Sequence, residues 1–309
     1  MSRCRIAVLI ILLSLFLTGC GGEEETKGPI SVASKIDTEG ALLGQMMVLV
    51  LEDAGFKVED KTEFGPTNVI REAIINDELD LYPEYTGNGG FFFDDTDPEI
   101  WKDAQKGYEK VRELDKEHNN LIWLKPASAN NTWAIAVRED LALEEGLETL
   151  SDLGRYVREG GRVKLAASEE FVSREDALPA FERAYNFELK DENLLIFAGG
   201  NTAQTIQAAG EGRDGVNFAM AYGTDGPVAA LGLVILEDTL GVQPVYEPAP
   251  LIRAEVLKDY PEIEDILETV FASLNLEILQ QLNAAIALEG RDAKEVAREY
   301  LETSGLLDG

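Results

Sequence analysis

Residues 81–88 read LYPEYTGN, a stretch that places two tyrosines where an extended segment ends. Residues 78–82 alternate polar and apolar side chains, which predicts a half-buried strand. Pro83 lacks the backbone N–H of a strand ladder, so we expect the strand to end there and residues 87–90 to form a loop. Tyrosines at the carboxyl end of a strand, followed by glycines, are typical of a ligand crevice in an α/β sheet. A turn with two core tyrosines would give the same pattern.

The segments before this stretch predict a repeating unit. Strand patterns at residues 30–34 and 57–62 alternate with helical patterns at residues 39–54 and 67–75. Asp37 or Thr38 is suited to cap the first helix, and Gly55 to end it. This order predicts a parallel sheet with right-handed crossovers, in which ligands gather beyond the carboxyl ends of the strands. Lys35, Gly65 and Tyr85 are expected at those ends.

A second α/β series follows an acidic helical segment at residues 94–117. Predicted strands at 121–124 and 131–137 lie between the two, and the later one is expected to cross into another domain. The series itself comprises predicted strands at 163–167, 194–198 and 218–222, with a helix from 151, a helix from 202, and a helical segment after 173 that Pro179 interrupts. Residues 233–236 and 248–253 are expected to return as strands to the first sheet, and residues 254–301 to be helical. We therefore expect an α/β protein whose first lobe comprises residues 30–132 and 233–309, and whose second lobe comprises residues 133–232.

The composition restricts the class of protein. The chain has 309 residues, 45% of them hydrophobic, with a formal net charge of −31, and its mean hydropathy of −0.11 is that of a globular protein. Nucleic acids and anionic membrane surfaces require a basic patch on their partners, so the charge argues against both. The acidity fits adaptation to strong salt and an ordinary solvated acidic surface equally well.

The N-terminus has the pattern of an export signal. Two arginines precede an apolar run at residues 6–17 that is too short to span a membrane, so residues 1–19 are predicted to be a signal peptide. The sequence LTGC at residues 17–20 resembles the lipobox of bacterial lipoproteins, which predicts lipidation at Cys20 and a tether at residues 20–29. A plain secretory signal with a chance cysteine is the alternative. Cleavage removes two arginines and no acid, giving a mature charge of −33 and a domain without a disulfide.

Signatures of enzymes are weak. His118 is the only histidine and lies in a polar run, which favours a solvated surface position over catalysis or metal binding. The chain has no P-loop, no Gly-x-Ser-x-Gly and no Cys-x-x-Cys motif. Carboxylate pairs such as Glu169 and Glu170 are expected by chance among 58 acids. We therefore predict no catalytic residue, no metal site and no enzymatic activity, with a secreted hydrolase as the less favoured reading.

Five short motifs carry a family resemblance. They are SKIDTE at 34–39, YPEYTG at 82–87, NNTW at 130–133, FVSR at 171–174 and YGTDG at 222–226. In this order they resemble the osmoprotectant receptors of ABC importers, which bind glycine betaine, choline and related quaternary ammonium compounds. The resemblance runs from about residue 30 to 307. It implies a type II periplasmic-binding-protein fold with a ligand cleft between two lobes, and an extracytoplasmic monomer without cofactor that serves ABC permease and ATPase subunits.

The resemblance also implies a set of ligand-binding residues. The aromatic cage of the family corresponds to Tyr85, Trp133, Tyr222 and Tyr246, and its carboxylate-binding groups to Arg174, Lys35 and Asn88. Cation–π attraction explains why rings hold a trimethylammonium group. Three departures put carboxylate coordination in question or alter the cage: Trp133 replaces a usual tyrosine, Asn88 stands where a threonine often is, and residues 36–40 differ.

The sequence leaves alternatives for these residues and for the ligand. Trp133 on an apolar strand could belong to the core, Tyr246 could anchor a loop between two prolines, and Arg174 could be a surface charge. Another small zwitterion, such as carnitine or an amino acid, is the alternative ligand.

Overall fold

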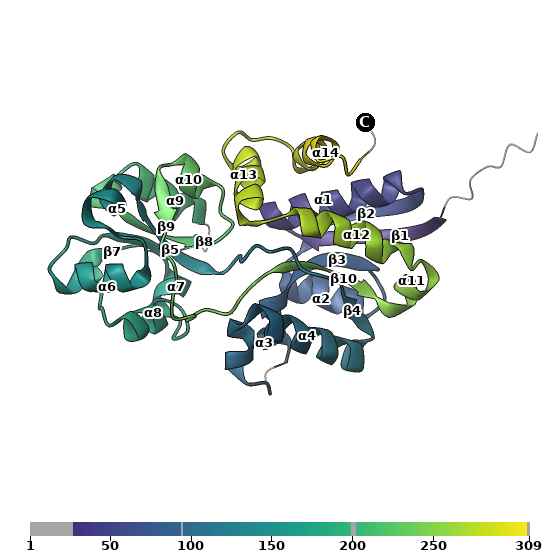
Figure 1. Ribbon diagram of the computed structural model, residues 1–309, viewed down its shortest axis with the longest axis horizontal. Coiled ribbons are helices and arrows are strands. Elements are labelled where there is room, and N and C mark those ends of the chain that lie inside the picture. Colours follow the sequence, from purple (N-terminus) through teal and green to yellow (C-terminus); the bar gives the residue numbers. More distant parts are fainter. Residues whose placement is uncertain (1–26, 94, 199–201, 308–309) are drawn as a thin grey trace, which may run out of the picture.

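Within residues 27–93, 95–198 and 202–307, which the computed structural model describes, the chain forms two five-stranded sheets (Figure 1). The first has the order β2-β1-β3-β10-β4, and the second has the order β7-β6-β8-β5-β9. The strands of the first sheet are β1 (Lys27–Lys35), β2 (Phe56–Gly65), β3 (Leu81–Tyr85), β4 (Leu121–Trp123) and β10 (Pro248–Arg253). Those of the second are β5 (Trp133–Arg138), β6 (Leu165–Ser168), β7 (Leu194–Phe197), β8 (Phe218–Tyr222) and β9 (Leu233–Ile235).

Helices cover both faces of the first sheet. One face packs against α1 (Thr38–Asp53), α12 (Glu262–Ser273), α13 (Leu276–Ala287) and α14 (Ala293–Thr303), and the other against α2 (Thr67–Ile75) and α4 (Ala104–Asn119). α11 (Ala254–Asp259) follows β10. The Asp37 carboxylate accepts a hydrogen bond from the N–H of Gly40 and so caps α1, whose apolar residues are almost entirely buried. This layering encloses the core on both sides of the sheet.

The second sheet is covered in the same way. Its helices α5 (Glu139–Glu145), α6 (Leu150–Arg158), α7 (Glu169–Ser173) and α8 (Leu178–Tyr185) share one core cluster with the sheet, and α9 (Thr202–Gly210) and α10 (Pro227–Ala230) share another. Pro179 lies in the first turn of α8, where its missing N–H is not needed, so it begins a helix rather than interrupting one.

Two segments cross between the lobes, at residues 124–132 and 236–247 (Figure 1). They bond to each other, because the Asn131 N–H donates to the Tyr246 carbonyl at 2.9 Å and the Tyr246 N–H donates to Asn130 Oδ1 at 2.8 Å. α13 makes a third connection: Gln280 Nε2 donates to the Gly223 carbonyl at 2.8 Å in the second lobe. The two crossing segments and α13 therefore connect the two lobes at three places.

The third strand differs from the sequence expectation. β3 spans residues 81–85 rather than 78–82, so Pro83 lies inside it. Pro83 pairs with Pro250 of β10, and neither proline has an N–H to donate to the other. The Pro250 carbonyl accepts a hydrogen bond from the Leu124 N–H of the neighbouring segment instead. β1 pairs with β3 only at Leu81. The missing N–H therefore breaks no ladder bond.

The predicted glycine loop is also wrong. Residues 86–88 form a 3₁₀ turn and α3 (Gly89–Phe92) follows it directly. A Cβ at Gly89 would lie 2.3 Å from the Trp101 ring. These glycines therefore allow the turn to pack against an indole.

The expectation that residues 233–236 return to the first sheet is wrong as well. β9 pairs antiparallel with β5 in the second sheet, and only β10 returns to the first. The lobe boundary predicted at residue 233 is therefore too early. The predicted signal peptide, Cys20 and most of the tether lie outside the described residues.

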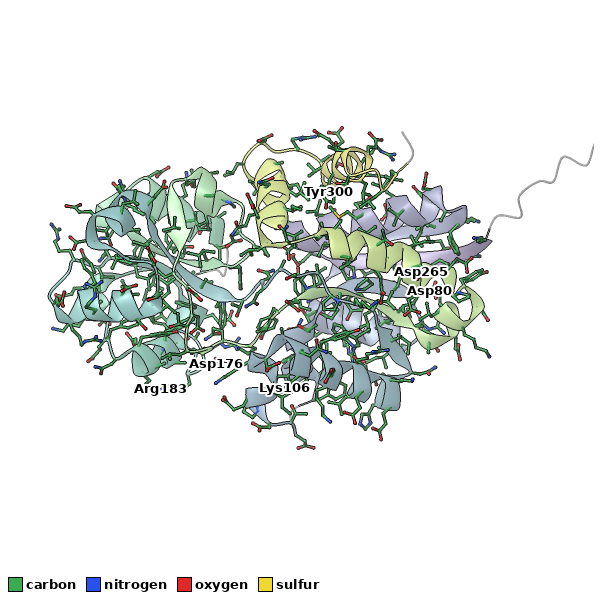
Figure 2. The ribbon with its side chains drawn as sticks, viewed as in Figure 1. Asp80, Lys106, Asp176, Arg183, Asp265 and Tyr300 are labelled. Atoms are coloured by element: carbon green, nitrogen blue, oxygen red, sulfur yellow. The ribbon has the colours of Figure 1, made fainter. Side chains whose placement is uncertain are left out.

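Charged side chains lie mostly on the outer surface, as Lys106, Arg183 and Asp265 do in Figure 2. Among the described residues, no helix is both long and apolar enough to cross a membrane.

Candidate ligand-binding site

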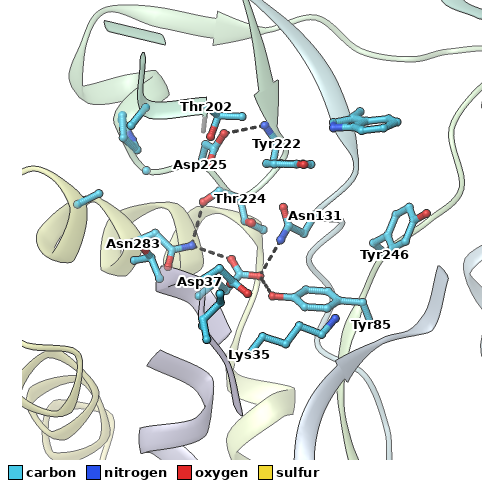
Figure 3. A pocket seen from close by; sticks show the side chains of 18 of the residues that line it. Lys35, Asp37, Tyr85, Asn131, Thr202, Tyr222, Thr224, Asp225, Tyr246 and Asn283 are labelled. Carbon is cyan, nitrogen blue, oxygen red and sulfur yellow. Dashed lines mark hydrogen bonds between the residues drawn. The ribbon is translucent and has the colours of Figure 1, made fainter. Parts of the chain in front are cut away.

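A cavity of about 690 Å³ lies between the two lobes (Figure 3). Its walls come from the carboxyl ends of β1, β3 and β8, the start of β5, the first turns of α1 and α9, α7, α13 and both crossing segments. All seven residues predicted to bind the ligand line it: Lys35, Tyr85, Asn88, Trp133, Arg174, Tyr222 and Tyr246. Their contact with a ligand stays a prediction, but their convergence on one cavity is a property of the structure.

Trp133 and Tyr222 form the aromatic wall from the second lobe. They are direct neighbours in the antiparallel register of β5 and β8, and their rings stack at 6.5 Å with 15° between the planes. The Phe171 and Trp133 rings make a T-shaped contact, with 5.7 Å between their centres. Strand register and core packing together fix the orientation of this wall.

Tyr85 and Tyr246 come from the first lobe and from a crossing segment. The Tyr246 ring packs on Gly87. A Cβ at Gly87 would lie 2.8 Å from this ring, so the missing side chain makes room for the tyrosine. The Tyr85 hydroxyl donates to Glu39 at 2.8 Å. Burial raises the pKa of Tyr85 well above 10, and the nearby Glu39 adds to this, so the phenol keeps its proton.

Lys35 is paired within the protein. Its Nζ lies 2.5 Å from Glu84 Oε1 and 4.7 Å from the centre of the Tyr85 ring. Glu84 is fully buried and also accepts hydrogen bonds from the Tyr82 hydroxyl and from Asn88 Nδ2. Lys35 and Asn88 therefore both donate to Glu84, and a ligand carboxylate would share these two donors with it.

Arg174 faces the cavity from the end of α7. Its guanidinium lies 4.5 Å from the centre of the Trp133 ring and bonds to Glu170 at 2.8 Å and to Asp176 at 2.7 Å. The hydrogen bonds to Asp176 and Glu170 raise its pKa, so it keeps its charge. The two carboxylates hold the guanidinium against the aromatic wall, where it can still meet an anion through the rest of its fork.

Sequence reasoning missed a polar cluster around Glu39 that also lines the cavity. Glu39 accepts from Tyr85 and from Asn131 Nδ2 at 3.2 Å on one oxygen, and from Asn283 Nδ2 at 2.7 Å on the other. Asn283 also donates to the Thr224 carbonyl at 3.0 Å. Glu39, Asn131 and Thr224 belong to motifs already noted in the sequence, but Asn283 lies in a helix with no motif.

Burial changes the acidity of this cluster. Burial raises the pKa of Glu39 from 4.5 to about 7, and hydrogen bonds from Tyr85 and Asn283 offset only part of this rise. Asp225, which lines the same cavity, has its pKa raised from 3.8 to about 6 by burial. Both carboxyl groups therefore titrate near neutral pH. Among the described residues, no group of three or more His, Cys, Asp and Glu side chains is arranged to hold a metal ion.

Comparisons with known proteins agree with this architecture. The family described as the substrate binding domain of ABC-type glycine betaine transport systems, OpuAC, matches residues 28–303. The chain is 59% identical to the glycine betaine-binding protein YehZ of Escherichia coli strain K12, over 91% of this chain and 92% of that protein. The structure of apo YehZ from the same organism superposes with a TM-score of 0.83, covering 91% of this chain and all of that one.

A more distant relative is a glycine-betaine-binding protein of Pseudomonas aeruginosa, which is 29% identical over the whole of this chain and 97% of its own length. The motif spellings are closest to the OsmF (YehZ) type, and the 59% identity confirms that prediction. The periplasmic-binding-protein architecture predicted from the resemblance is confirmed by the superposition. The chain thus belongs to the OpuAC family of ABC-importer substrate-binding domains, a transport family rather than an enzyme family.

Proposed function

We propose that this protein is the extracytoplasmic receptor that captures glycine betaine or a related quaternary ammonium osmoprotectant and delivers it to an ABC permease. The observation that carries the proposal is the convergence of four aromatic residues on one cavity: Tyr85, Trp133, Tyr222 and Tyr246. A trimethylammonium group has no N–H to donate, so the faces of aromatic rings suit it better than hydrogen-bond acceptors do.

Binding and lobe closure are coupled in this proposal. Trp133, Tyr222 and Arg174 belong to the second lobe, whereas Lys35 and Tyr85 belong to the first. A betaine whose ammonium contacts rings of both lobes, with its carboxylate near Arg174, draws the lobes together. The closed, loaded form is then the one that the permease recognises.

The first test is calorimetric titration with glycine betaine, choline, carnitine and a standard amino acid. Trp133→Ala should weaken glycine betaine about tenfold or more, because a desolvated cation–π contact contributes up to ~2 kcal/mol and ~1.4 kcal/mol is one decade. Phe91→Ala, which removes an aromatic ring that is 70% exposed, is the matched control and should bind normally. Unchanged binding in Trp133→Ala would show that this ring is a core residue and not a ligand-binding one. Binding of the amino acid alone would favour a different zwitterion as the ligand.

Arg174 separates the two ends of the ligand. Arg174→Ala removes a charge-assisted partner of the carboxylate, so glycine betaine should lose more affinity than choline, which has no carboxylate. Equal losses for the two ligands would exclude the arginine from carboxylate binding.

The proposal includes export, a monomeric state and a lipid anchor at Cys20, and the LTGC sequence at residues 17–20 supports the anchor. Mass spectrometry of the native protein should find an acylated N-terminus, and Cys20→Ala should leave an unlipidated precursor. A native N-terminus without acyl chains would refute the anchor.

A further inference from the structure

Glu84 connects two of the three groups that are predicted to bind a ligand carboxylate. It lies in β3, is fully buried and does not line the cavity itself. Its Oε1 accepts hydrogen bonds from Lys35 Nζ at 2.5 Å, from Asn88 Nδ2 at 2.7 Å and from the Tyr85 N–H at 2.7 Å. Its Oε2 accepts one from the Tyr82 hydroxyl at 2.9 Å. The first-lobe half of the predicted carboxylate site is therefore built around a buried anion.

The charges of Glu84 and Lys35 cancel. Lys35 is the one cation that forms an ion pair with Glu84 among the residues that the structure describes, and the Lys35 and Glu84 side chains are 8% and 0% exposed. Arg71, another buried cation of this lobe, donates to Asp115 instead. Water and salt screen a buried pair much less than an exposed one, so Glu84 offsets most of the attraction that Lys35 would exert on a ligand carboxylate.

Arg174 in the second lobe lies in a more solvated environment. It also bonds to two carboxylates, but those of Glu170 and Asp176 are 56% and 64% exposed, and the arginine itself is 46% exposed. Solvent around these groups weakens their effect on a ligand. The Lys35 ammonium, which lies beside the Tyr85 ring (Figure 3), has N–H donors that Glu84 does not use, but it offers them as part of a neutral pair.

We propose that Glu84 is a positioning residue that lowers the preference of the cavity for ligands with a carboxylate. It holds Lys35 and Asn88 at the cavity wall and cancels the lysine charge, so that Arg174 supplies the net positive charge that a carboxylate meets. This inference rests on the proposed function and deepens it. It assigns the discrimination between a zwitterion, such as glycine betaine, and a cation, such as choline, to a residue that touches neither ligand.

Charge-removing variants test the role of Glu84 by calorimetry, with the ratio of the glycine betaine affinity to the choline affinity as the readout. Glu84→Gln keeps the size of the side chain and leaves the lysine charge unopposed, so this ratio should rise about tenfold or more. Lys35→Met leaves the buried carboxylate unopposed, so the ratio should fall by a similar factor. A merely structural role of Glu84 would change both affinities equally and leave the ratio where it is.

The double variant Lys35→Met/Glu84→Gln separates the effect of the pair from that of the lysine alone. It removes both charges together, and a protein tolerates the replacement of a whole buried ion pair better than the loss of one partner. The double variant therefore keeps the test decisive even where Glu84→Gln does not fold. Its ratio should lie within about threefold of that of the unmodified protein, whatever the change in absolute affinity.

Asp80→Asn is the matched control. Asp80 lies just before the amino end of β3 and bonds to Arg253 at 3.1 Å and to Ser31 at 2.9 Å, and none of these three residues lines the cavity. This variant removes a carboxylate from the same lobe, so its stability reports the cost of a lost ion pair while its affinity ratio should stay unchanged.

Three outcomes would overturn this inference while leaving betaine binding in place. They are a ratio that stays constant in both single variants, a double variant whose ratio falls as far as that of Lys35→Met, and a ratio that rises in Asp80→Asn as far as in Glu84→Gln. Failure of every trimethylammonium ligand to bind the unmodified protein would overturn the proposed function and this inference together.

Discussion

Glu39 occupies the first turn of α1, where the partial positive charge of the helix N-terminus favours a carboxylate, yet its burial favours the protonated acid. The raised pKa shows that burial prevails. The folded protein therefore binds a proton at Glu39 more tightly than the unfolded chain does, and this difference links stability to pH.

We expect the stabilising contribution of protonated Glu39 to be fully present below pH 4.5 and lost as the pH rises toward about 7. Because one pKa unit corresponds to about 1.4 kcal/mol, the loss amounts to roughly 3 kcal/mol. Asp225, with a pKa raised to about 6, acts in the same direction. Urea denaturation of the ligand-free protein and of Glu39→Gln between pH 4.5 and 7.5 measures the effect. The two stability curves should diverge with pH, and parallel curves would contradict a raised pKa at Glu39.

Individual site residues differed in how far the sequence revealed them. The residues assigned by the resemblance all line one cavity, because the topology gathers the ends of four strands, the turn after β3, the end of α7 and a crossing segment there. Asn283 could not be found, since it lies on α13 and meets Glu39 across 244 positions of sequence. The partners of Lys35 and Arg174 were not foreseen either, because ion pairing depends on the packing of side chains.

At the level of elements, the helical and strand periods located most segments, and α2, β8 and β10 have the predicted bounds. The errors arose where tertiary contacts override local preference. Pro83 is tolerated inside β3 because its neighbours require no bond from it, and the glycines after β3 form helical turns because Trp101 packs on them. The short β9 could not be assigned to a sheet, since three apolar residues carry no information about their partner.

The contact between α13 and the second lobe gives a test at this level. A Cβ at Gly226 would lie 2.1 Å from the Ala284 backbone nitrogen, so Gly226→Ala should destabilise the protein by about 1–3 kcal/mol. Gly107, inside α4, has only ordinary contacts at 3.5 Å or more, so Gly107→Ala should instead stabilise by about 0.5–1 kcal/mol. Thermal denaturation of both variants should show shifts of opposite sign. A Gly226→Ala variant as stable as the unmodified protein would show that α13 can move away from the second lobe without cost.

Over the whole molecule, the net charge of −31 implies mutual repulsion among surface carboxylates. If the acidity reflects adaptation to salt, the melting temperature should climb from low salt toward 1 M, where the Debye length falls to ~3 Å. Sodium chloride and potassium chloride should act alike, because screening depends on ionic strength. A flat melting temperature over this range would leave the acidity as ordinary surface composition.

The positions of the three tryptophans add an optical property. Trp101 and Trp123 are buried in the core of the first lobe, at 3% and 1% exposure, and only Trp133 lines the cavity, beneath the guanidinium of Arg174. A cation bound against the Trp133 indole would change the fluorescence of this tryptophan, while Trp101 and Trp123 would contribute a constant background. Replacing Trp101 and Trp123 by phenylalanine would leave a single-tryptophan protein whose fluorescence reports the occupancy of the cavity without an added label.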